Sequence, residues 1–360
     1  MPSSTHPGVL VCGAGAFGRN HLRVYRTLAT EGAAVRLAAI VEPDAARAAA
    51  AAGEWGVPVF ASVEESLSAR ARGEARFEAA SVCAPTSAHF AIAQALLAAE
   101  VDVLIEKPIA TTVAEATEAI DLAARNGRVL QAGHLERFNP AVTATEPILN
   151  RPMFFEAHRL SVFSARSLDV DVVLDLMVHD LDVVLALVRC PVRSLHAVGL
   201  PILSRKVDIA NVRVEFESGC VANFTASRVS TERVRKLRFF QPHQYVSIDY
   251  ARQDLLVIDV SGAAEAGPET LAAASAAAGA HPLAGAGFGG FAGLRIEKPK
   301  VEPGEPLRLE IESFLECVRR RSKPRVGGED GRAALALALD INRAIAEHAE
   351  RAGLGRFASR

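Results

Sequence analysis

The 360-residue chain has no strong excess of either charge, no long apolar run and no paired-cysteine motif. Its formal net charge of -2 argues against nucleic acid or an anionic membrane surface as the main partner. It contains no run of about 18 apolar residues, so we expect no transmembrane helix. The polar segment Met1–Gly8 leaves no room for a secretory signal with its own apolar stretch.

The cysteines are odd in number and scattered, and no two of them have the C-x-x-C spacing. This usage predicts reduced thiols of a cytoplasmic protein and argues against disulfides or a zinc site. Half of the residues are hydrophobic and 23% are charged, which is ordinary for a globular protein. At roughly 150 residues per domain, the length predicts two domains.

An apolar stretch, a glycine-rich turn and a helical segment open the chain. Gly8–Cys12 is apolar, and Gly13–Gly18 reads G-x-G-x-x-G, in which the glycines allow a tight turn and close approach of a pyrophosphate. The next predicted strand, Val35–Val41, ends at Glu42, about 20–25 residues past the glycines, where a carboxylate can accept hydrogen bonds from a ribose 2′-hydroxyl. Because that carboxylate would repel a 2′-phosphate, we expect NAD rather than NADP. The alternative interpretation of Glu42 is a solvated carboxylate in a loop.

Polar residues follow several of the later strands. Apolar strands predicted at Ala79–Ala84, Val101–Ile105 and Val129–Ala132 alternate with helices, which predicts an α/β fold with a doubly wound parallel sheet of the Rossmann type. Ligands of such sheets bind beyond the carboxyl ends of the strands. The residues expected to bind the cofactor are Gly13, Gly15, Ala16, Phe17, Gly18, Glu42, Pro85, Thr86, His89, Glu106, Lys107 and His134.

The second half of the sequence has a different character. From Met153 onward, longer strands separated by turns predict a large, mostly antiparallel sheet with the helix Val172–Val188 on one face. The Ala- and Gly-rich segment Ala263–Leu294 is interpreted as an inserted, mobile loop. The amphipathic helices Leu307–Arg321 and Asp330–Glu350 are expected to pack back on the first domain. The predicted divisions are a dinucleotide-binding domain at 1–133, a substrate and oligomerisation domain at 134–304, and C-terminal helices at 305–360.

The stretch Asp175–Asp182 places charged groups in an otherwise apolar helix. Asp175 and His179 are four residues apart and share one helix face, and such groups are costly to bury unless they pair with each other or with a ligand. They form either a structural pair or a catalytic one. We expect no metal, because the acidic and imidazole groups of one helix cannot all point at one ion. Asp180 and Asp182 are interpreted as structural.

Four pieces of the sequence together resemble the Gfo/Idh/MocA family of sugar oxidoreductases. They are the Gly13–Gly18 turn, the Glu106-Lys107-Pro108 triplet, Gly133-His134 with Arg137-Phe138, and Asp175-x-x-x-His179. The resemblance covers Val9 to about Ala349 and implies that Lys107, Asp175 and His179 form the catalytic group beside the nicotinamide. It also implies a homo-oligomer, for which an exposed face of the second sheet is a plausible surface.

The residues before Asp175 lack the glycines found in many members of the family. Asp169–Met177 and Gly133–Pro140 instead resemble the branch that oxidises the 3-hydroxyl of UDP-N-acetylglucosamine on the way to diamino-sugar lipid A. The alternatives are a dehydrogenase of inositol, an aldose or another small polyol, a glycoside hydrolase that uses NAD transiently, and a non-catalytic NAD-binding regulator. The intact Lys107, Asp175 and His179 argue against the regulator.

Alcohol oxidation requires a base to take the hydroxyl proton and a hydride acceptor. His179 has a suitable intrinsic pKa for the base, and Asp175 can fix its tautomer. Lys107 can stabilise negative charge on the substrate oxygen, and it competes with His179 for the role of base. Cationic groups near the expected substrate site would suit a diphosphate, although each taken alone fits a surface or structural charge better. These groups are Arg137, His158, Arg159 and Arg166.

Overall fold

The computed structural model describes residues 6–163, 170–261 and 295–354. The chain forms two compact units. Unit 1 comprises Met1–Phe138 and Gly304–Ala336, and unit 2 comprises Asn139–Pro303 and Leu337–Arg360. The segment interpreted from sequence as a mobile loop, Ala263–Leu294, lies outside the described residues.

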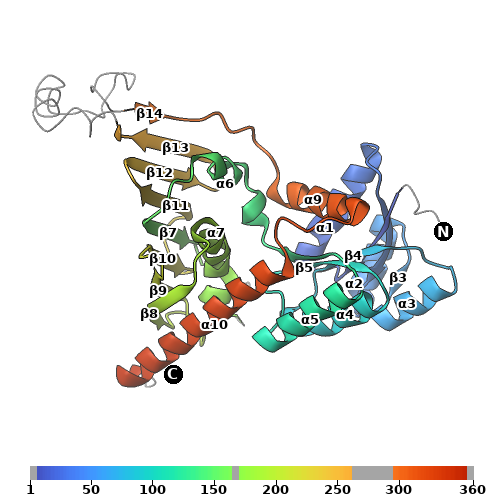
Figure 1. Cartoon of the computed structure of the whole chain (residues 1–360). Helices are drawn as coiled ribbons and strands as arrows, with labels where there is room; N and C mark the ends of the chain where they lie inside the picture. Colours follow the sequence, from blue (N-terminus) through green and yellow to red (C-terminus); the bar gives the residue numbers. More distant parts are fainter. Residues whose placement is uncertain (1–5, 164–169, 262–294, 355–360) are drawn as a thin grey trace, which may run out of the picture. The chain divides into compact units, whose positions relative to one another are not determined.

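Unit 1 is built on a six-stranded, fully parallel sheet with the strand order β3-β2-β1-β4-β5-β6 (Figure 1). The order reverses between β1 and β4, which is where ligands of doubly wound sheets bind. The predicted Rossmann sheet is therefore confirmed. Its strands are β1 (Gly8–Cys12), β2 (Arg36–Val41), β3 (Val59–Phe60), β4 (Ala79–Val82), β5 (Asp102–Glu106) and β6 (Leu130–Gly133).

Helices cover both faces of this sheet, because its strands are buried along their whole length and must pack on each side. Leu22 and Tyr25 of α1 pack with Ile311 and Phe314 of α9 in one core cluster, and the two helices lie side by side in Figure 1. The helices of unit 1 are α1 (Ala16–Thr30), α2 (Ala45–Trp55), α3 (Val63–Ala71), α4 (Thr86–Ala98), α5 (Val113–Arg125), the 3-10 turn η1 (Leu135–Phe138) and α9 (Pro306–Arg320).

Unit 2 contains an eight-stranded sheet with the order β14-β13-β12-β11-β7-β10-β9-β8. Neighbouring strands are antiparallel except β7 and β10, which confirms the mostly antiparallel sheet expected from the sequence. The strands are β7 (Phe154–Leu160), β8 (Val192–Leu200), β9 (Ile209–Phe216), β10 (Val221–Ser227), β11 (Val234–Gln241), β12 (Gln244–Asp249), β13 (Asp254–Asp259) and β14 (Arg295–Glu297).

One face of the eight-stranded sheet is covered by α7 (Val178–Val188), as Figure 1 shows. Leu181 and Val184 of this helix share a buried core with Phe155 and Phe224 of the sheet. Short turns of the chain, α6 (Pro140–Thr143) and the 3-10 turn η2 (Glu146–Ile148), lead into the first strand of the sheet. The opposite face carries alternate residues that are half-buried or exposed.

The helix expected at Val172–Val188 consists of two parts. A π-helical turn, η3 (Val173–Met177), precedes α7. A π turn admits one extra residue per turn, and such turns are frequent at functional sites. Asp175 lies in the π turn and His179 in the regular helix, so their relation is not the simple four-residue spacing of an α-helix.

The last helix, α10 (Gly328–Arg351), is divided between the units after Ala336. Its later residues Leu337, Ala338, Ile341 and Ile345 join the core of unit 2. The sequence pattern predicts instead that the C-terminal helices at 305–360 both pack back on the first domain. The difference arises because an amphipathic pattern identifies an apolar face without identifying what that face packs against.

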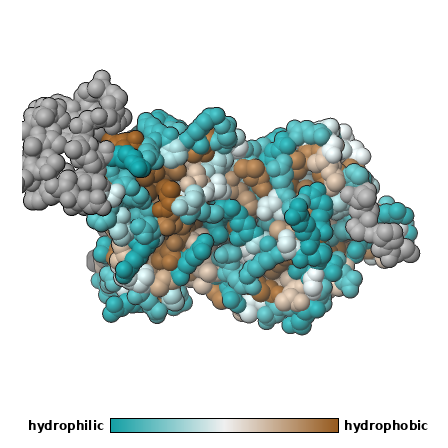
Figure 2. Space-filling view, turned by 45° about the horizontal axis from the view of Figure 1, so that its top comes forward, coloured by the Kyte–Doolittle hydropathy of each residue, from teal (hydrophilic) through white to brown (hydrophobic). Residues whose placement is uncertain are grey.

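The face of the molecule seen in Figure 2 is mostly hydrophilic, with hydrophobic residues gathered in separate patches. Among the described helices, none is long and apolar enough to cross a membrane. All five cysteines are free in the structure.

Candidate active site

The glycine-rich turn is tightly packed at its ends and open in its middle. Gly13 has φ +102°, and a Cβ there would lie 2.8 Å from the carbonyl oxygen of Cys83. A Cβ at Gly18 would lie 1.9 Å from the carbonyl oxygen of Gly13, so the start of α1 packs directly on the turn. A Cβ at Gly15, by contrast, would meet nothing within 4 Å. The turn therefore leaves an open approach to the backbone at Gly15.

The N-terminus of α1 faces this opening with its peptide N–H groups uncapped. Gly15 is the N-cap residue, no side chain caps the helix, and its first turn contains no acidic residue. The first N–H groups of a helix lack internal partners and carry a partial positive charge, so they attract phosphate. The turn thus fits the pyrophosphate of a dinucleotide.

Glu42 follows β2 and is held rigidly. Its Oε2 accepts a hydrogen bond from the Ala14 N–H at 2.9 Å. Its Oε1 accepts hydrogen bonds from the Asp44 N–H at 3.0 Å and from the Arg47 guanidinium at 2.9 Å. Burial alone would raise the pKa of Glu42, but these three donors lower it below its ordinary value. An ionised, oriented carboxylate at this position fits a ribose diol.

These features surround a cavity of about 550 Å³ within unit 1. The cavity is large enough for part of a dinucleotide. Of the residues expected to bind the cofactor, those lining it are Gly13, Gly15, Ala16, Phe17, Glu42 and Pro85. The lining residues that were not predicted from the sequence include Cys12, Arg47, Ser62, Cys83, Ala88 and Ile92. Arg47 could have been predicted from the sequence, because it is a cation a few residues after Glu42.

Five further residues expected at the cofactor site lie at or shortly after the ends of β4, β5 and β6 and do not line this cavity: Thr86, His89, Glu106, Lys107 and His134. Thr86 is the first residue of α4. His89 is buried, and its ring nitrogens each lie 2.8 Å from a carbonyl oxygen, those of Pro108 and Ala84. Burial lowers the pKa of His89. Its contacts tie the end of β4 to the segment after β5.

Glu106, Lys107 and His134 lie together at the ends of the paired strands β5 and β6. Glu106 is buried and Lys107 is half-buried. Burial lowers the pKa of His134 to about 4, although the nearby Glu106 acts in the opposite direction. Arg137 follows in η1, mostly buried, with its guanidinium 3.8 Å from the Asp330 carboxylate. Unit 1 thus collects a lysine, a neutral imidazole and a guanidinium beside the carboxyl ends of its strands.

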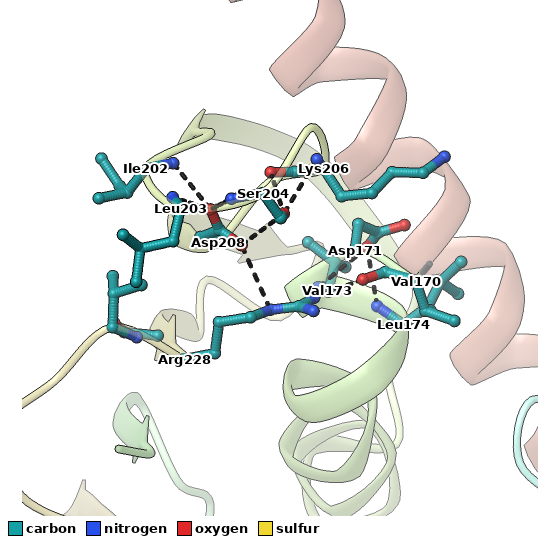
Figure 3. Close-up of polar contacts among 12 residues, drawn as sticks. Val170, Asp171, Val173, Leu174, Ile202, Leu203, Ser204, Lys206, Asp208 and Arg228 are labelled. Atoms are coloured by element: carbon teal, nitrogen blue, oxygen red, sulfur yellow. Dashed lines mark hydrogen bonds and ion pairs between the residues drawn. The ribbon is translucent and has the colours of Figure 1, made fainter. Parts of the chain in front are cut away.

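In unit 2, the helix that carries Asp175 and His179 is anchored at its start (Figure 3). Asp171 Oδ1 accepts hydrogen bonds from the N–H groups of Val173 and Leu174. Arg228 donates to the carbonyl oxygen of Val170 and lies 3.6 Å from the carboxylate of Asp208. Both charged groups are buried.

Asp208 in turn holds the loop between β8 and β9. Its Oδ2 accepts hydrogen bonds from the N–H groups of Ile202, Leu203 and Ser204 at 2.6–2.8 Å. Burial alone would raise the pKa of Asp208, but a hydrogen bond from the Ser204 hydroxyl and these backbone hydrogen bonds lower it. The polar cluster of Figure 3 therefore fixes where the helix with Asp175 and His179 begins.

Asp175 and His179 are half-buried, whereas Asp180 and Asp182 are buried. Asp180 receives two hydrogen bonds from Arg159 of β7, at 2.8 and 3.0 Å, so this pair fastens α7 to the sheet. The Arg159 guanidinium also lies 5.0 Å from the centroid of the Tyr250 ring. Arg159, one of the cationic groups considered for a diphosphate, is thus occupied in the core.

His158 lies on the other face of β7, because successive strand residues point to opposite sides of a sheet. The structure therefore places His158 away from the face that α7 covers, and not beside Asp175 and His179. The sequence does not predict this placement of His158, because in the usual alternation the charged Arg159 would point outward, whereas here Arg159 points into the core. Arg166 lies outside the described residues.

The sequence matches two models of one family. Residues 8–134 match the oxidoreductase family with an NAD-binding Rossmann fold, and residues 151–241 match the Gfo/Idh/MocA C-terminal domain. A relative from Acidithiobacillus ferrooxidans, UDP-N-acetylglucosamine 3-dehydrogenase, is 33% identical over 336 residues, which cover 93% of this chain and 96% of the relative. Inositol 2-dehydrogenase from Leifsonia xyli is 34% identical over 192 residues, covering 51% of this chain and 54% of the relative.

Solved structures agree with these matches. The structure of the Acidithiobacillus ferrooxidans enzyme GnnA superposes with a TM-score of 0.80 at 32% identity, covering 94% of this chain and 97% of that one. An aldose-aldose oxidoreductase from Caulobacter crescentus, at 19% identity, shares the fold with a TM-score of 0.74, covering 95% of this chain and 98% of that one. The glycine turn, the oriented Glu42 and these matches lead to one conclusion: the chain belongs to the Gfo/Idh/MocA family of NAD-binding oxidoreductases.

Proposed function

We propose that the protein is an NAD-dependent dehydrogenase that oxidises the 3-hydroxyl of UDP-N-acetylglucosamine to the 3-keto sugar. The observation that carries this proposal is the 33% identity to a UDP-N-acetylglucosamine 3-dehydrogenase across 93% of the chain, which includes parts of both units. The inositol dehydrogenase of Leifsonia xyli matches only about half of its own length. A likeness over both units supports a shared substrate better than a likeness over one half.

In the proposed mechanism, His179 takes the proton from the 3-hydroxyl while the hydride leaves the same carbon. NAD, when bound, supplies the hydride acceptor. Asp175 accepts a hydrogen bond from the second ring nitrogen of His179, and this favours the imidazolium that forms. Lys107 donates to the substrate oxygen and stabilises its developing negative charge. These roles rest on the family resemblance and on the residue types, which suit the chemistry.

We further propose that the protein is a cytoplasmic homo-oligomer serving the diamino-sugar route to lipid A. The face of the eight-stranded sheet opposite α7 supports the oligomer, since among the described residues Phe240 is exposed there, stacks on Phe154 and lies at a tilt against Tyr245. Arg137 is a candidate for the substrate diphosphate, because it lies close behind the strand ends of unit 1.

The test is a panel of substrates, and turnover of each is measured by the absorbance of the reduced nicotinamide. UDP-N-acetylglucosamine, UDP-glucose, free N-acetylglucosamine, myo-inositol and a glucoside are each incubated with the protein and NAD. We expect turnover of UDP-N-acetylglucosamine at least about 100-fold faster, in kcat/KM, than of the free sugars. Turnover of free polyols alone would refute the nucleotide-sugar assignment. Release of free sugar from the glucoside without accumulation of reduced cofactor would indicate a glycoside hydrolase instead.

Variants test the residue assignments on the same assay. His179→Ala and Lys107→Ala should each lower kcat by about 100-fold or more, because each removes a group that acts in the transition state. Their melting temperatures should stay close to that of the parent protein, since both side chains are only half-buried. Full turnover by either variant would contradict the mechanism, whatever the substrate.

A further inference from the structure

We propose that His21 and Glu106 form a buried couple that positions Lys107. His21 lies on α1, three residues after the last glycine of the dinucleotide turn, and Glu106 is the last residue of β5. The couple would connect the cofactor-binding turn to the strand end that carries the lysine. The inference rests on the proposed role of Lys107 in catalysis.

His21 is fully buried, and its Nε2 lies 3.0 Å from Oε1 of Glu106. A carboxylate oxygen can only accept a hydrogen bond, so Nε2 must carry the proton in this contact. The other ring nitrogen, Nδ1, is buried with no hydrogen-bond partner among the described residues. The imidazole therefore makes a single polar contact here, and that contact is to Glu106.

The same imidazole touches the glycine-rich turn. Its ring centroid lies 5.5 Å from that of Phe17, and Phe17 lines the cofactor cavity. The close packing of Gly18 on Gly13 fixes the first turn of α1, and so fixes His21 one turn later. Any side chain in place of Gly18 would push this helix away from the turn. The position of His21 is thus set by the element that receives the cofactor.

Glu106, held by His21, in turn restricts the position of Lys107. It is 6% exposed, and its Oε2 accepts a hydrogen bond from the backbone N–H of Lys107 at 3.3 Å. On its other side it packs against Gly133 of β6, where a Cβ would lie 2.8 Å from Oε1. Gly133 therefore leaves only enough room for the carboxylate. With His21 on one side, Gly133 on another and the Lys107 backbone at its end, the carboxylate has one available position.

A buried carboxylate is costly unless its oxygens are hydrogen-bonded. A structural role alone would be served by an apolar pair of similar size, which is often as stable as a buried polar pair. The His21–Glu106 contact is instead made directly beside the lysine of the strand end. A displacement of about 1 Å in a reacting group can cost on the order of 100-fold in rate, so a couple that fixes Lys107 has a function beyond stability.

The test compares His21→Leu with His21→Gln and Glu106→Gln in the full chain. Leu removes the donor, whereas the Gln amide nitrogen can replace Nε2 of the imidazole. The matched control is Tyr25→Phe, because Tyr25 is also buried on α1, one turn further on, and loses a 2.7 Å hydrogen bond to Ser81. The readout that needs no substrate is the rate of reductive methylation of Lys107, followed by peptide mass spectrometry, with the exposed Lys300 as internal reference.

We expect His21→Leu and Glu106→Gln to change the Lys107 methylation rate by roughly threefold or more, with Lys300 unchanged. Tyr25→Phe should leave the rate unchanged although its melting temperature falls. With substrate, His21→Leu should lower kcat by about 10-fold or more, and His21→Gln should recover most of it. In His21→Leu, the dissociation constant for NADH should stay within about threefold of the parent value, since Glu42 and the glycine-rich turn are intact.

Unchanged methylation of Lys107 in His21→Leu would overturn the proposal. A loss of NADH affinity as large as the loss of kcat would also overturn it, because the couple would then serve the cofactor turn alone. Altered methylation in a protein that does not oxidise UDP-N-acetylglucosamine would uphold the couple while refuting the proposed substrate.

Discussion

At the scale of single residues, Glu42 is the side chain on which cofactor choice depends most directly. It is 3% exposed and receives hydrogen bonds from Ala14, Asp44 and Arg47. Arg47 lines the same cavity and is itself about half exposed. The cavity wall thus holds an anion that repels a 2′-phosphate next to a cation that could bind one.

Glu42→Ala should therefore shift the preference from NADH toward NADPH. Removal of the carboxylate ends the repulsion and leaves Arg47 free to pair with the 2′-phosphate. We expect the ratio of the two dissociation constants, measured by nicotinamide fluorescence, to change by about 10-fold or more. The double variant Glu42→Ala, Arg47→Leu should lose the gain. An unchanged ratio in the single variant would mean that Glu42 does not select the cofactor.

His134 makes the stability of the protein depend on pH. Burial lowers its pKa in the folded protein to about 4, from an ordinary value of 6.5. Between these values the unfolded chain binds more protons than the folded one, so stability falls as the pH falls from 6.5 towards 4. From pH 7 to pH 5 the free energy of unfolding should drop by about 2 kcal/mol from this group.

Urea unfolding at the two pH values measures that drop, and His134→Asn provides the comparison. The variant should lose the part of this drop that comes from His134, whatever its stability at pH 7, and retain the part that His89 contributes through its own lowered pKa. An equal drop in parent and variant would show that His134 is not the group responsible.

At the scale of the elements, the start of the helix with Asp175 and His179 depends on the Asp208–Arg228 pair. Both side chains are buried, and Arg228 reaches the backbone of Val170. Asp208→Asn should lower the free energy of unfolding by about 3 kcal/mol, because it removes a carboxylate that pairs with a buried guanidinium. It should also lower kcat, because the chain entering the π turn loses its anchor.

The exposed pair Arg213–Glu215 on the same sheet is the matched control. Glu215→Gln should cost less than about 1 kcal/mol, since solvent screens exposed ion pairs, and it should leave kcat unchanged. Chemical denaturation measures the free energy of unfolding of the two variants, and steady-state assays measure their kcat. A similar small cost for both would show that the buried pair is not an anchor.

Sequence periodicity identified the helix around Asp175 but not its π turn. Apolar residues at helical spacing indicate which face is buried. They carry no information on whether a turn is closed by a hydrogen bond between residues five apart, as in a π turn, or four apart, as in an α-helix. His21 was missed for a similar reason. A single histidine on an apolar helix gives no signal until Glu106, 85 positions further along the chain, is known to contact it.

At the scale of the whole molecule, local chemistry predicted the fold well. The glycine turn, the carboxylate after β2 and the polar residues after β4 and β5 each belong to a strand end, and parallel strands place all such ends on one edge. The side of β7 on which His158 lies could not be predicted, because the core-facing Arg159 inverts the usual pattern and its partner Asp180 comes from another element. The partition of α10 depends on long-range packing in the same way.

We propose that hydride leaves carbon 3 of UDP-N-acetylglucosamine. The most direct measurement uses substrate carrying deuterium at that carbon, with mass spectrometry of the reduced cofactor formed in one turnover. We expect NADH to gain one deuterium and the His179→Ala variant to form almost no reduced cofactor. Reduced cofactor without deuterium, or transfer from a label at another carbon, would contradict it.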